Sequence, residues 1–323
     1  MNKETGNIDI LSSQNQLRLY GYEENFNLFT KLYNNNKLPN VILLTGLKGS
    51  GKATFAYHFI NYLLSMNEDN KYSLTNYTIN PYNRSFNNLC NKVHPNFFLL
   101  ENNDFEENIK IDNVKNILSF LNKSTLNSNI RIVLIDNAEY LNVNSSNALL
   151  KSLEEPKDNT FFFIIHNSAS KILDTIKSRC IQFNLYFPFL QKKNILLSII
   201  TQYNYNFNIE NIDSNLFFDS PGNILKYLKF LIDNKIDFNE DKLSCISYLI
   251  SNYKKKKDPQ LLNFISLLVE IFYNELSIKN NKKLNIYSFN KFKILKQISD
   301  LKKFNLDKNN LFILLQETLK NDS

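Results

Sequence analysis

The sequence is poor in residues that interrupt or cross-link a chain. It has six glycines and seven prolines among 323 residues, and so few breakers favour long helices over an all-β fold with many turns. Its three cysteines, Cys90, Cys180 and Cys245, are widely spaced. Such spacing argues against a disulfide framework, so we expect three reduced thiols.

Segments typical of secretion or membrane insertion are also lacking. The opening MNKETGNIDI contains acidic residues and no apolar core, unlike a signal peptide. The longest apolar stretch, residues 264–273, is too short to cross a bilayer and includes Glu270. We therefore expect a cytoplasmic protein with no membrane partner.

What the chain does contain indicates a soluble, folded protein. Hydrophobic residues make up 43% and charged residues 21%, and the length allows two or three domains. A net charge of +7 suits a nucleic-acid partner. However, Asn, Lys, Ile, Phe and Tyr are abundant throughout, as AT-rich coding would produce. The one charge run, residues 254–257 (Lys254 to Lys257), is more typical of a solvated helix end than of a DNA contact.

The first 185 residues alternate between short apolar runs and helical patterns. Continuous apolar character is typical of strands covered on both faces, and the runs are residues 41–45, 97–101, 131–135, 161–165 and 180–184. Between them we predict a helix from Lys52 to residue 65, a helix capped by Asp112, and a helix capped by Asn144 or Ser145 that ends before Pro156. This alternation predicts a three-layer α/β domain.

Beyond about residue 187 the strand-like runs stop and only helical periodicity continues. The polar stretch 235–242 is a candidate boundary within this helical part. We therefore predict three domains: an α/β domain over residues 1–187, a small helical domain over 188–240, and an all-α domain over 241–323.

The segment GLKGSGKAT, residues 46–54, has nearly the form of a phosphate-binding loop. Gly46, Gly51 and Lys52 are in place between a predicted strand and a predicted helix. Ala53 stands where the pattern has Ser or Thr, and Thr54 lies about 100° further round the helix. The loop could bind ATP or ADP with a poorly held Mg²⁺, or it could persist because its turn needs the glycines.

The acidic half of such a site is also incomplete. Asp136 follows the predicted strand 131–135, as the metal-associated acid of a phosphate-loop protein does. The next residue is Asn137, where an active ATPase of the AAA+ type has a glutamate that orients water. Glu139 comes three residues after the acid, and we expect it to point elsewhere. Two separate losses favour a site that does not hydrolyse ATP.

Several segments with a specific pattern occur in order over roughly residues 18–187. They are YGYEENFNLFTKLYNNNKLPNVILLTGLKGSGKAT, VHPNFFLLE, IRIVLIDNAEYLNVNSSNALLKSLEEP, FFFIIHNS and IKSRCIQF. Together they resemble the delta-prime branch of the AAA+ subunits in bacterial DNA polymerase III clamp loaders. This resemblance implies an AAA+ phosphate-loop domain with a parallel sheet and flanking helices, a helical lid and an all-α C-terminal collar. The implied partners are the tau/gamma and delta subunits, the sliding clamp and, through the complex, primed DNA.

The resemblance also implies roles for single residues. The nucleotide-binding positions, which could be vestigial, are Gly46, Gly49, Gly51, Lys52, Thr54 and Asp136. Ser178, Arg179 and Cys180 match the family's SRC motif, whose arginine reaches the ATP of a neighbouring subunit. A guanidinium at the γ-phosphate neutralises developing charge, so Arg179 is the predicted arginine finger, acting in trans. An ordinary surface arginine is the other interpretation.

Three departures from the family matter. Its members usually carry a zinc module of four cysteines, whereas this chain has only Cys90 and His94 in that region, so we predict no zinc. Asn223 stands where catalytic relatives have a lid arginine. His166 and Asn167 follow the fourth strand, where relatives place a polar sensor residue, although a satisfied polar pair is an equally good interpretation.

Other functions are less well supported by the sequence than that of a non-hydrolysing clamp-loader subunit. An ATP-hydrolysing AAA+ subunit of the tau/gamma type is the main alternative, and Ala53, Asn137 and Asn223 argue against it. A phosphate-loop kinase lacks support because no acceptor-site motif is present. A general nucleic-acid binder rests on charge alone, and a dinucleotide fold would need a third glycine after GSG.

Overall fold

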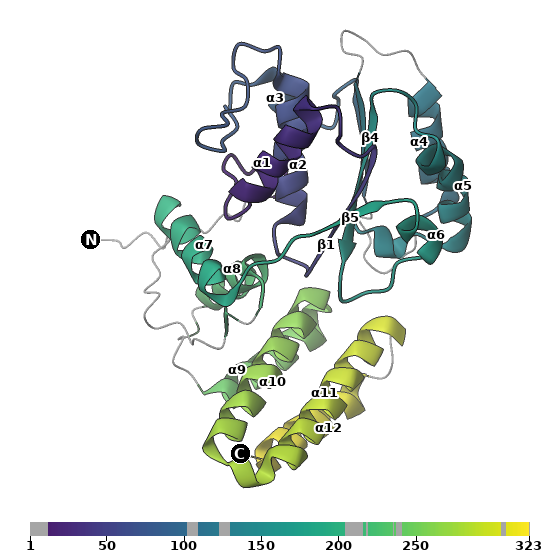
Figure 1. Ribbon diagram of the computed structural model, residues 1–323. Helices are drawn as coiled ribbons and strands as arrows, with labels where there is room; N and C mark the ends of the chain where they lie inside the picture. The colour runs from purple at the N-terminus through teal and green to yellow at the C-terminus, as the bar shows by residue number, and fades with distance from the viewer. Residues whose placement is uncertain are drawn as a thin grey trace. The chain divides into compact units, whose positions relative to one another are not determined.

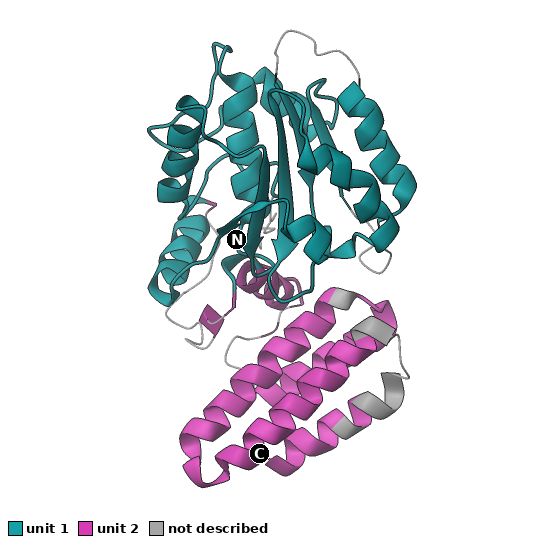
Figure 2. Ribbon diagram, turned by 45° about the vertical axis from the view of Figure 1, so that its right-hand side comes forward, with its two compact units in different colours: residues 1–202, 220–222 teal, residues 203–219, 223–323 magenta. Residues whose placement is uncertain are grey.

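The computed structural model describes residues 12–101, 109–122, 130–203, 216–217, 219–234, 236, 241–304 and 308–322. The chain forms two compact units (Figure 2). Unit 1 comprises Met1–Gln202 and Ser220–Gly222, and unit 2 comprises Tyr203–Asp219 and Asn223–Ser323. The three domain ranges from the sequence stay predictions, and most of the candidate boundary 235–242 lies outside the described residues.

Unit 1 is built on a five-stranded sheet in which every pairing is parallel (Figure 1). The strand order is β2-β3-β4-β1-β5. The strands are β1 (Val41–Gly46), β2 (Phe97–Leu100), β3 (Arg131–Ile135), β4 (Thr160–Asn167) and β5 (Ile181–Asn184). All five predicted parallel strands are therefore confirmed, but the expectation that every one is buried is wrong for β5, which is an edge strand with mostly exposed residues. Because the strands are parallel, the loops after β1, β3 and β4 meet at one edge of the sheet.

Helices cover both faces of this sheet (Figure 1). One face carries α1 (Glu23–Asn34), α2 (Lys52–Ser65) and α3 (Arg84–Cys90), and the other carries α4 (Ile111–Asn122), α5 (Val143–Glu154) and α6 (Asp174–Lys177). Alternate residues of β1 enter different cores: Ile42 and Leu44 pack with the α1–α2 phenylalanines, while Val41 and Leu43 pack with the α4–α5 aliphatics. The predicted three-layer α/β arrangement is confirmed.

Two predicted helix starts are corrected by the structure. Helix α4 begins at Ile111, so Asp112 lies in its first turn, 2.8 Å from the Lys115 ammonium, and is not the N-cap. Helix α5 is capped by Asn142, whose side chain accepts a hydrogen bond from the Ser145 amide at 2.8 Å. The sequence offers several polar residues here, and the extended backbone of Asn142 decides which one caps. Helix α2 begins at Lys52, as predicted.

The α1–α2 core encloses one histidine. His58 is completely buried; its Nε2 lies 3.0 Å from the Gln16 carbonyl oxygen and its Nδ1 lies 3.0 Å from the Tyr72 hydroxyl. The carbonyl can only accept, so Nε2 carries the proton and Nδ1 accepts from Tyr72. Burial is the main cause that lowers the pKa of His58 from 6.5 to about 3.

This histidine predicts a loss of stability in mild acid. The folded-state pKa lies below the unfolded one, so the stabilisation is complete above pH 6.5 and is lost as the pH falls below it. Urea unfolding at pH 5.0 should give a free energy of unfolding about 2 kcal/mol below that at pH 7.5. The variant His58→Gln keeps a donor for Gln16 and should show a clearly smaller pH dependence. Burial also lowers the pKa of His94, so the dependence should not vanish; an undiminished slope would contradict the assignment to His58.

The remaining helices confirm that only helices follow the sheet in the part of the chain with described structure. They are α7 (Phe189–Gln202), α8 (Pro221–Asp233), α9 (Lys242–Lys256), α10 (Pro259–Lys279), α11 (Leu284–Phe304) and α12 (Lys308–Asp322). In unit 2, α10 packs on α9 and α11, and Tyr253 of α9 meets Phe312 of α12 with ring centroids 5.6 Å apart.

The lysine run 254–257 and the longest apolar stretch of the sequence both lie in unit 2. The lysine run is indeed an exposed helix end: Lys254 to Lys256 close α9 and Lys257 is its C-cap, a position where cations are favourable. Helix α10 is longer than the apolar stretch marked in the sequence. Its residues Gln260–Lys279 are long and apolar enough to cross a membrane, but 56% of that window is buried, as in a core helix.

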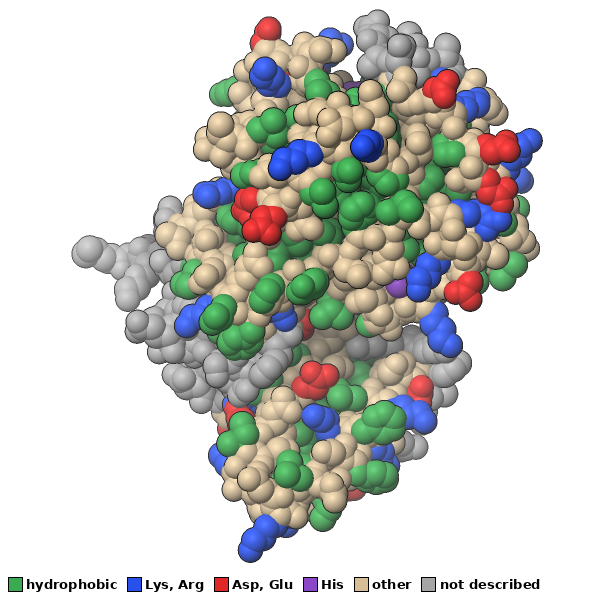
Figure 3. All heavy atoms as spheres, viewed as in Figure 1, with side chains coloured by type: hydrophobic (Ala, Val, Ile, Leu, Met, Phe, Trp, Pro, Cys, Tyr) green, Lys and Arg blue, Asp and Glu red, His purple; other side chains and the backbone are tan. Residues whose placement is uncertain are grey.

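Strand β5 is an edge strand with apolar side chains left exposed. Ile181 is 54% exposed, and Tyr186 and Leu190, which follow the strand, are each 74% exposed. Figure 3 shows hydrophobic side chains grouped on unit 1 in the region of α1 and β5. Exposed apolar groups of this kind mark surfaces that contact other molecules.

Candidate nucleotide site and arginine motif

The segment 46–54 forms a loop between β1 and α2, in the strand-loop-helix context that a phosphate loop needs. Gly49 has a φ of 81° and Gly51, the N-cap of α2, a φ of 87°. These left-handed conformations suit glycine and explain why two of the six glycines lie here. The loop geometry follows from local sequence.

Every carbonyl oxygen from Gly46 to Gly51 accepts a hydrogen bond from the protein. The donors are, in order, Lys52 Nζ and Ser168 N for Gly46, Lys52 Nζ and Ser50 N for Leu47, Ser220 Oγ for Lys48, Gly222 N for Gly49, Tyr22 Oη for Ser50, and Phe55 N for Gly51. The Ser50 amide is itself used in this network, as the donor to Leu47. The conformation of the loop is therefore fixed by hydrogen bonds within unit 1.

Lys52 is bound to this loop rather than extended from it. Its ammonium donates to the Gly46 carbonyl at 2.8 Å and to the Leu47 carbonyl at 2.7 Å, and the residue is 6% exposed. Burial lowers the pKa of Lys52 to about 8, against the opposing effect of Glu139 and Asp136. Two of the three N–H groups of the ammonium are therefore engaged by the loop itself.

The segment Ser220–Gly222, which sequence reasoning missed, donates hydrogen bonds to two carbonyls of the loop. Ser220 Oγ donates to the Lys48 carbonyl at 2.7 Å, and Gly222 N donates to the Gly49 carbonyl at 2.9 Å. A Cβ on Gly222 would lie 2.7 Å from the Gly49 oxygen. The small residues of SPG were the available signal, but their contact with a loop some 170 positions earlier exists only in the fold.

The side chains near the loop do not include the usual magnesium ligand of a phosphate loop. Ala53 packs its methyl group against the α1–α2 core. Buried hydroxyls are present on Thr45 and Ser50, and among the described residues neither has a hydrogen-bond partner. No hydroxyl stands at the position after Lys52, where the metal ligand of a phosphate loop belongs.

The acidic residues after β3 lie at the same edge, and one of them corrects our prediction. Asp136 directly follows β3, and burial raises its pKa. Asn137 has a φ of 58° and starts a 3₁₀ turn, Ala138–Tyr140. This turn brings Glu139 back to the strand ends, where its carboxylate accepts from the Asn167 amide at 3.2 Å and is the strongest charge influence on Lys52. The expectation that Glu139 points elsewhere was wrong, because the left-handed backbone of Asn137 turns the chain back toward the strand ends.

The polar pair at the end of β4 is satisfied within its own turn. His166 Nε2 lies 3.0 Å from the Ser170 carbonyl oxygen, and the Asn167 side chain accepts from the Ala169 amide at 3.2 Å. The register places Asn167 beside Gly46. This arrangement favours a polar strand end over a sensor that reaches toward a phosphate.

The region that carries zinc in the resembling family has no matching ligand set. Cys90 Sγ lies 3.5 Å from the Gln14 carbonyl oxygen. His94 Nε2 lies 3.3 Å from Ser85 Oγ, and its Nδ1 accepts from the Asn96 amide at 3.2 Å. No group of three or more His, Cys, Asp or Glu side chains suited to a metal occurs among the described residues. The residues present do not fit a zinc site.

The SRC motif forms a tight turn between α6 and β5. Ser178 Oγ donates to the Thr175 carbonyl at 3.3 Å, and Cys180 Sγ to the Ile176 carbonyl at 3.1 Å. Burial raises the pKa of the Cys180 thiol to about 12, so it stays protonated. These two side chains hold the turn, and Arg179 is the member whose charged group reaches the surface, with 28% of its side chain exposed.

Arg179 and the phosphate loop lie at opposite ends of the sheet. Ile181, two residues after Arg179, pairs with Ile42 near the start of β1, whereas the loop follows Gly46. Four residues of strand separate the two levels by about 13 Å. Arg179 also pairs with Glu154, the last residue of α5, shortly before β4 begins. The structure thus does not bring Arg179 to the chain's own phosphate loop.

Asn223 belongs to unit 2. Its side-chain amide donates to Asp219 Oδ1 at 3.0 Å. An amide carries no charge to offer a phosphate, and this one is already engaged within its own unit.

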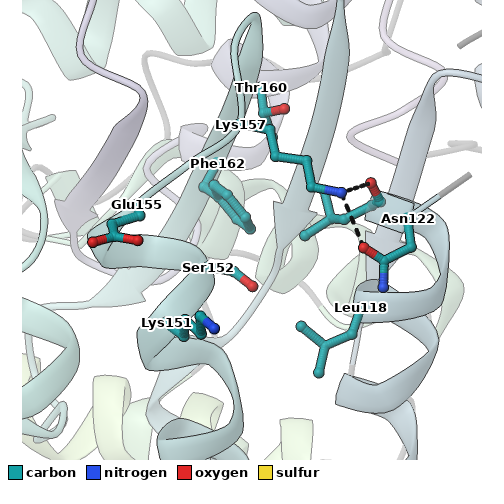
Figure 4. A pocket seen from close by; sticks show the side chains of 9 residues that line it. Leu118, Asn122, Lys151, Ser152, Glu155, Lys157, Thr160 and Phe162 are labelled. Carbon is teal, nitrogen blue, oxygen red and sulfur yellow. Dashed lines mark hydrogen bonds between the residues drawn. The ribbon is translucent and has the colours of Figure 1, made fainter. Parts of the chain in front are cut away.

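A separate cavity lies between α4 and α5, near the start of β4 (Figure 4). Its volume is about 370 Å³. Lys157 reaches across it and donates to the Leu121 carbonyl at 3.1 Å and to Asn122 Oδ1 at 3.0 Å. None of the predicted site residues lines this cavity.

Comparison with known proteins agrees with this fold and these motifs. The family model described as "DNA polymerase III, delta subunit" matches residues 21–188, which is more than half of the chain. A segment of 90 residues is 42% identical to the DNA polymerase III subunit delta' of Pseudomonas aeruginosa, and covers 28% of this chain and 27% of that protein. The corresponding protein of Buchnera aphidicola subsp. Schizaphis graminum is 27% identical over 241 residues, which cover 74% of this chain and 67% of that protein.

Relatives of a second kind are similar too. The DNA polymerase III subunit gamma of the same Buchnera is 24% identical over 254 residues, 77% of this chain and 56% of that protein. A solved structure of a DNA polymerase III, gamma subunit-related protein from Thermotoga maritima covers 91% of this chain and 99% of its own, with 16% identity and a TM-score of 0.49. The first curated relatives are matched over 27%, 52% and 67% of their lengths. With the family model matched across the whole α/β region, this chain belongs to the DNA polymerase III, delta subunit family.

Proposed function

We propose that the chain is a delta-prime-type clamp-loader subunit that does not hydrolyse ATP itself and donates Arg179 to the ATP of a neighbour. The observation that carries this proposal is the separation of Arg179 from the chain's own phosphate loop by the length of the sheet. A guanidinium that stabilises a γ-phosphate must approach within hydrogen-bond distance. Arg179 can therefore serve only a nucleotide held by another subunit.

The chain's own site supports binding more than hydrolysis. The amides of Gly49 and Gly51 and the ammonium of Lys52 would hold the phosphates of ATP or ADP, with the Thr54 hydroxyl as a lesser candidate. The Asp136 carboxylate would take part only through a metal ion. A nucleotide bound to this loop would interact with it only through the negative charge of its phosphates. Ala53 offers no oxygen to Mg²⁺, and Asn137 cannot accept a proton from water. Lys52 already has two carbonyl partners, which lowers what it gains from a phosphate.

The exposed edge of β5 supports a subunit contact. Ile181 is exposed at the start of the strand, two residues after Arg179, whereas the exposed Tyr186 and Leu190 follow its other end. A neighbour that covers these apolar groups would remove them from water and place its nucleotide beside the arginine. We expect tau/gamma and delta as the partners, the sliding clamp and primed DNA as the substrates of the whole complex, and a cytoplasmic setting.

Purification of the chain from its native cell tests this proposal. We expect co-elution with tau/gamma and delta subunits at high salt, because the apolar contact does not depend on charge screening. A protein that elutes alone and hydrolyses ATP would contradict the proposal.

An ATP-hydrolysing subunit of the tau/gamma type remains the second candidate, and one observation favours it. Glu139 lies near Lys52 and Asp136 and could replace the missing glutamate at position 137. We expect no ATP hydrolysis by the isolated chain above the rate of a Lys52→Ala control. If the chain does hydrolyse ATP and Glu139→Gln abolishes it, the second candidate replaces the first.

A further inference from the structure

The guanidinium of Arg179 is held by hydrogen bonds from all three of its nitrogens. Along one edge, Nε donates to Glu154 Oε1 at 2.7 Å, and Nη2 donates to the same oxygen. Nη1 donates to the Thr175 carbonyl at 2.8 Å and lies 3.4 Å from Ser178 Oγ. The third edge, formed by the outer ends of Nη1 and Nη2, meets no further acceptor among the described residues.

This third edge is the one that a phosphate needs. A guanidinium recognises phosphate through two parallel N–H groups in a fixed plane. A long side chain that is free to rotate would present that pair rarely, whereas one clamped on both sides presents it in a single orientation. The contacts to Glu154 and Thr175 fix both the plane and the direction of the fork.

The Glu154 carboxylate has no evident structural reason to be where it is. It is the last residue of α5, and a negative charge in the last turn opposes the helix dipole. The pair with Arg179 is partly exposed, 28% for the arginine and 48% for the glutamate, and such ion pairs stabilise a fold very little. The contact therefore matters more for the orientation of Arg179 than for folding.

We propose that Glu154 is a positioning residue, which holds the Arg179 guanidinium so that its end fork faces the nucleotide of the neighbouring subunit. This inference rests on the proposed trans role of Arg179. Glu154 would thus be a second residue of this chain that promotes ATP hydrolysis by the neighbour. It would act through Arg179 and would not contact the nucleotide itself.

The first test measures ATP hydrolysis by the complex reconstituted with tau/gamma and delta subunits. Glu154→Ala should lower kcat about tenfold with an unchanged KM for ATP, because binding is kept and orientation is lost. Glu154→Gln keeps an acceptor oxygen and should fall between Glu154→Ala and the unchanged chain. Glu155→Ala is the matched control, since Glu155 directly follows as the C-cap of α5 and none of the hydrogen bonds of Arg179 goes to it; it should leave kcat unchanged.

The second test observes the contact itself in the isolated chain. The sequence has four arginines, Arg18, Arg84, Arg131 and Arg179, so the Nε–H signals in a ¹⁵N NMR spectrum are few, and Arg179→Lys identifies the relevant one. We expect Glu154→Ala to shift this signal and to speed its exchange with water, with no change in the thermal unfolding midpoint, and Glu155→Ala to do neither.

The outcomes separate this inference from the function on which it rests. If Arg179→Ala does not slow hydrolysis, the proposed trans role fails and the positioning role fails with it. If Arg179→Ala slows hydrolysis while Glu154→Ala leaves kcat unchanged or raises it, only the positioning role is overturned. An unshifted Nε–H signal in Glu154→Ala would also overturn it.

Discussion

Replacement of Arg179 by alanine should reduce ATP hydrolysis in the reconstituted complex about 10³-fold at the site that this residue serves, the lower end of what arginine fingers contribute. The guanidinium offers two parallel donors and a charge that cannot be lost, and no other group in the SRC turn can replace it. Single-turnover hydrolysis measured by rapid quench resolves this site from the others in the complex.

Two further variants sharpen the Arg179 experiment. Arg179→Lys keeps the charge but loses the planar fork, so we expect it to recover little of the rate. Lys177→Ala removes an exposed cation from the same turn and should behave as the unchanged chain does. All three variants should elute with the partner subunits; loss of assembly in Arg179→Ala would mean that the arginine is an interface residue and not a catalytic one.

Replacement of Gly46 by alanine should destabilise unit 1 by about 3 kcal/mol, whether or not a nucleotide is present. An added Cβ at this position would lie 2.2 Å from the Leu185 carbonyl oxygen. That oxygen belongs to the backbone, and the Leu185 amide donates a hydrogen bond to the Thr45 carbonyl at 2.8 Å. Neither backbone segment can therefore move aside without breaking the pairing of β1 with β5. Urea unfolding in the absence of nucleotide measures the effect.

Gly51→Ala is the matched control for the glycine experiment. Its Cβ would meet only Tyr22 at 3.5 Å, so its cost comes from the left-handed backbone and should be about 1 kcal/mol. If both variants unfold like the unchanged chain and differ only in affinity for ATP, the glycines are there for the phosphate. The predicted result would instead mean that glycine is needed at position 46 for the packing of the strands, even when no ligand is bound.

The sequence by itself determined the α/β architecture. Five apolar runs predicted the five parallel strands because a strand covered on both faces needs apolar residues at every position, as in β1, β3 and β4. The edge strand β5 is mostly exposed and departs from that rule. The start of α2 at Lys52 followed from the loop that precedes it. Helix starts at Asp112 and near Asn144 were misplaced by two or three residues, because several neighbouring polar residues can cap and local backbone conformation chooses among them.

At the candidate site, local sequence patterns identified single residues, and only the tertiary structure showed which of them lie close together. The sequence marked Lys52, Asp136 and Arg179, since each stands in a short motif whose spacing reflects its chemistry. It could not show that a left-handed Asn137 returns Glu139 to the strand ends, or that Glu154 clamps Arg179. Those contacts join residues from different elements, and their distances are set by how helices pack on the sheet, which no local spacing encodes.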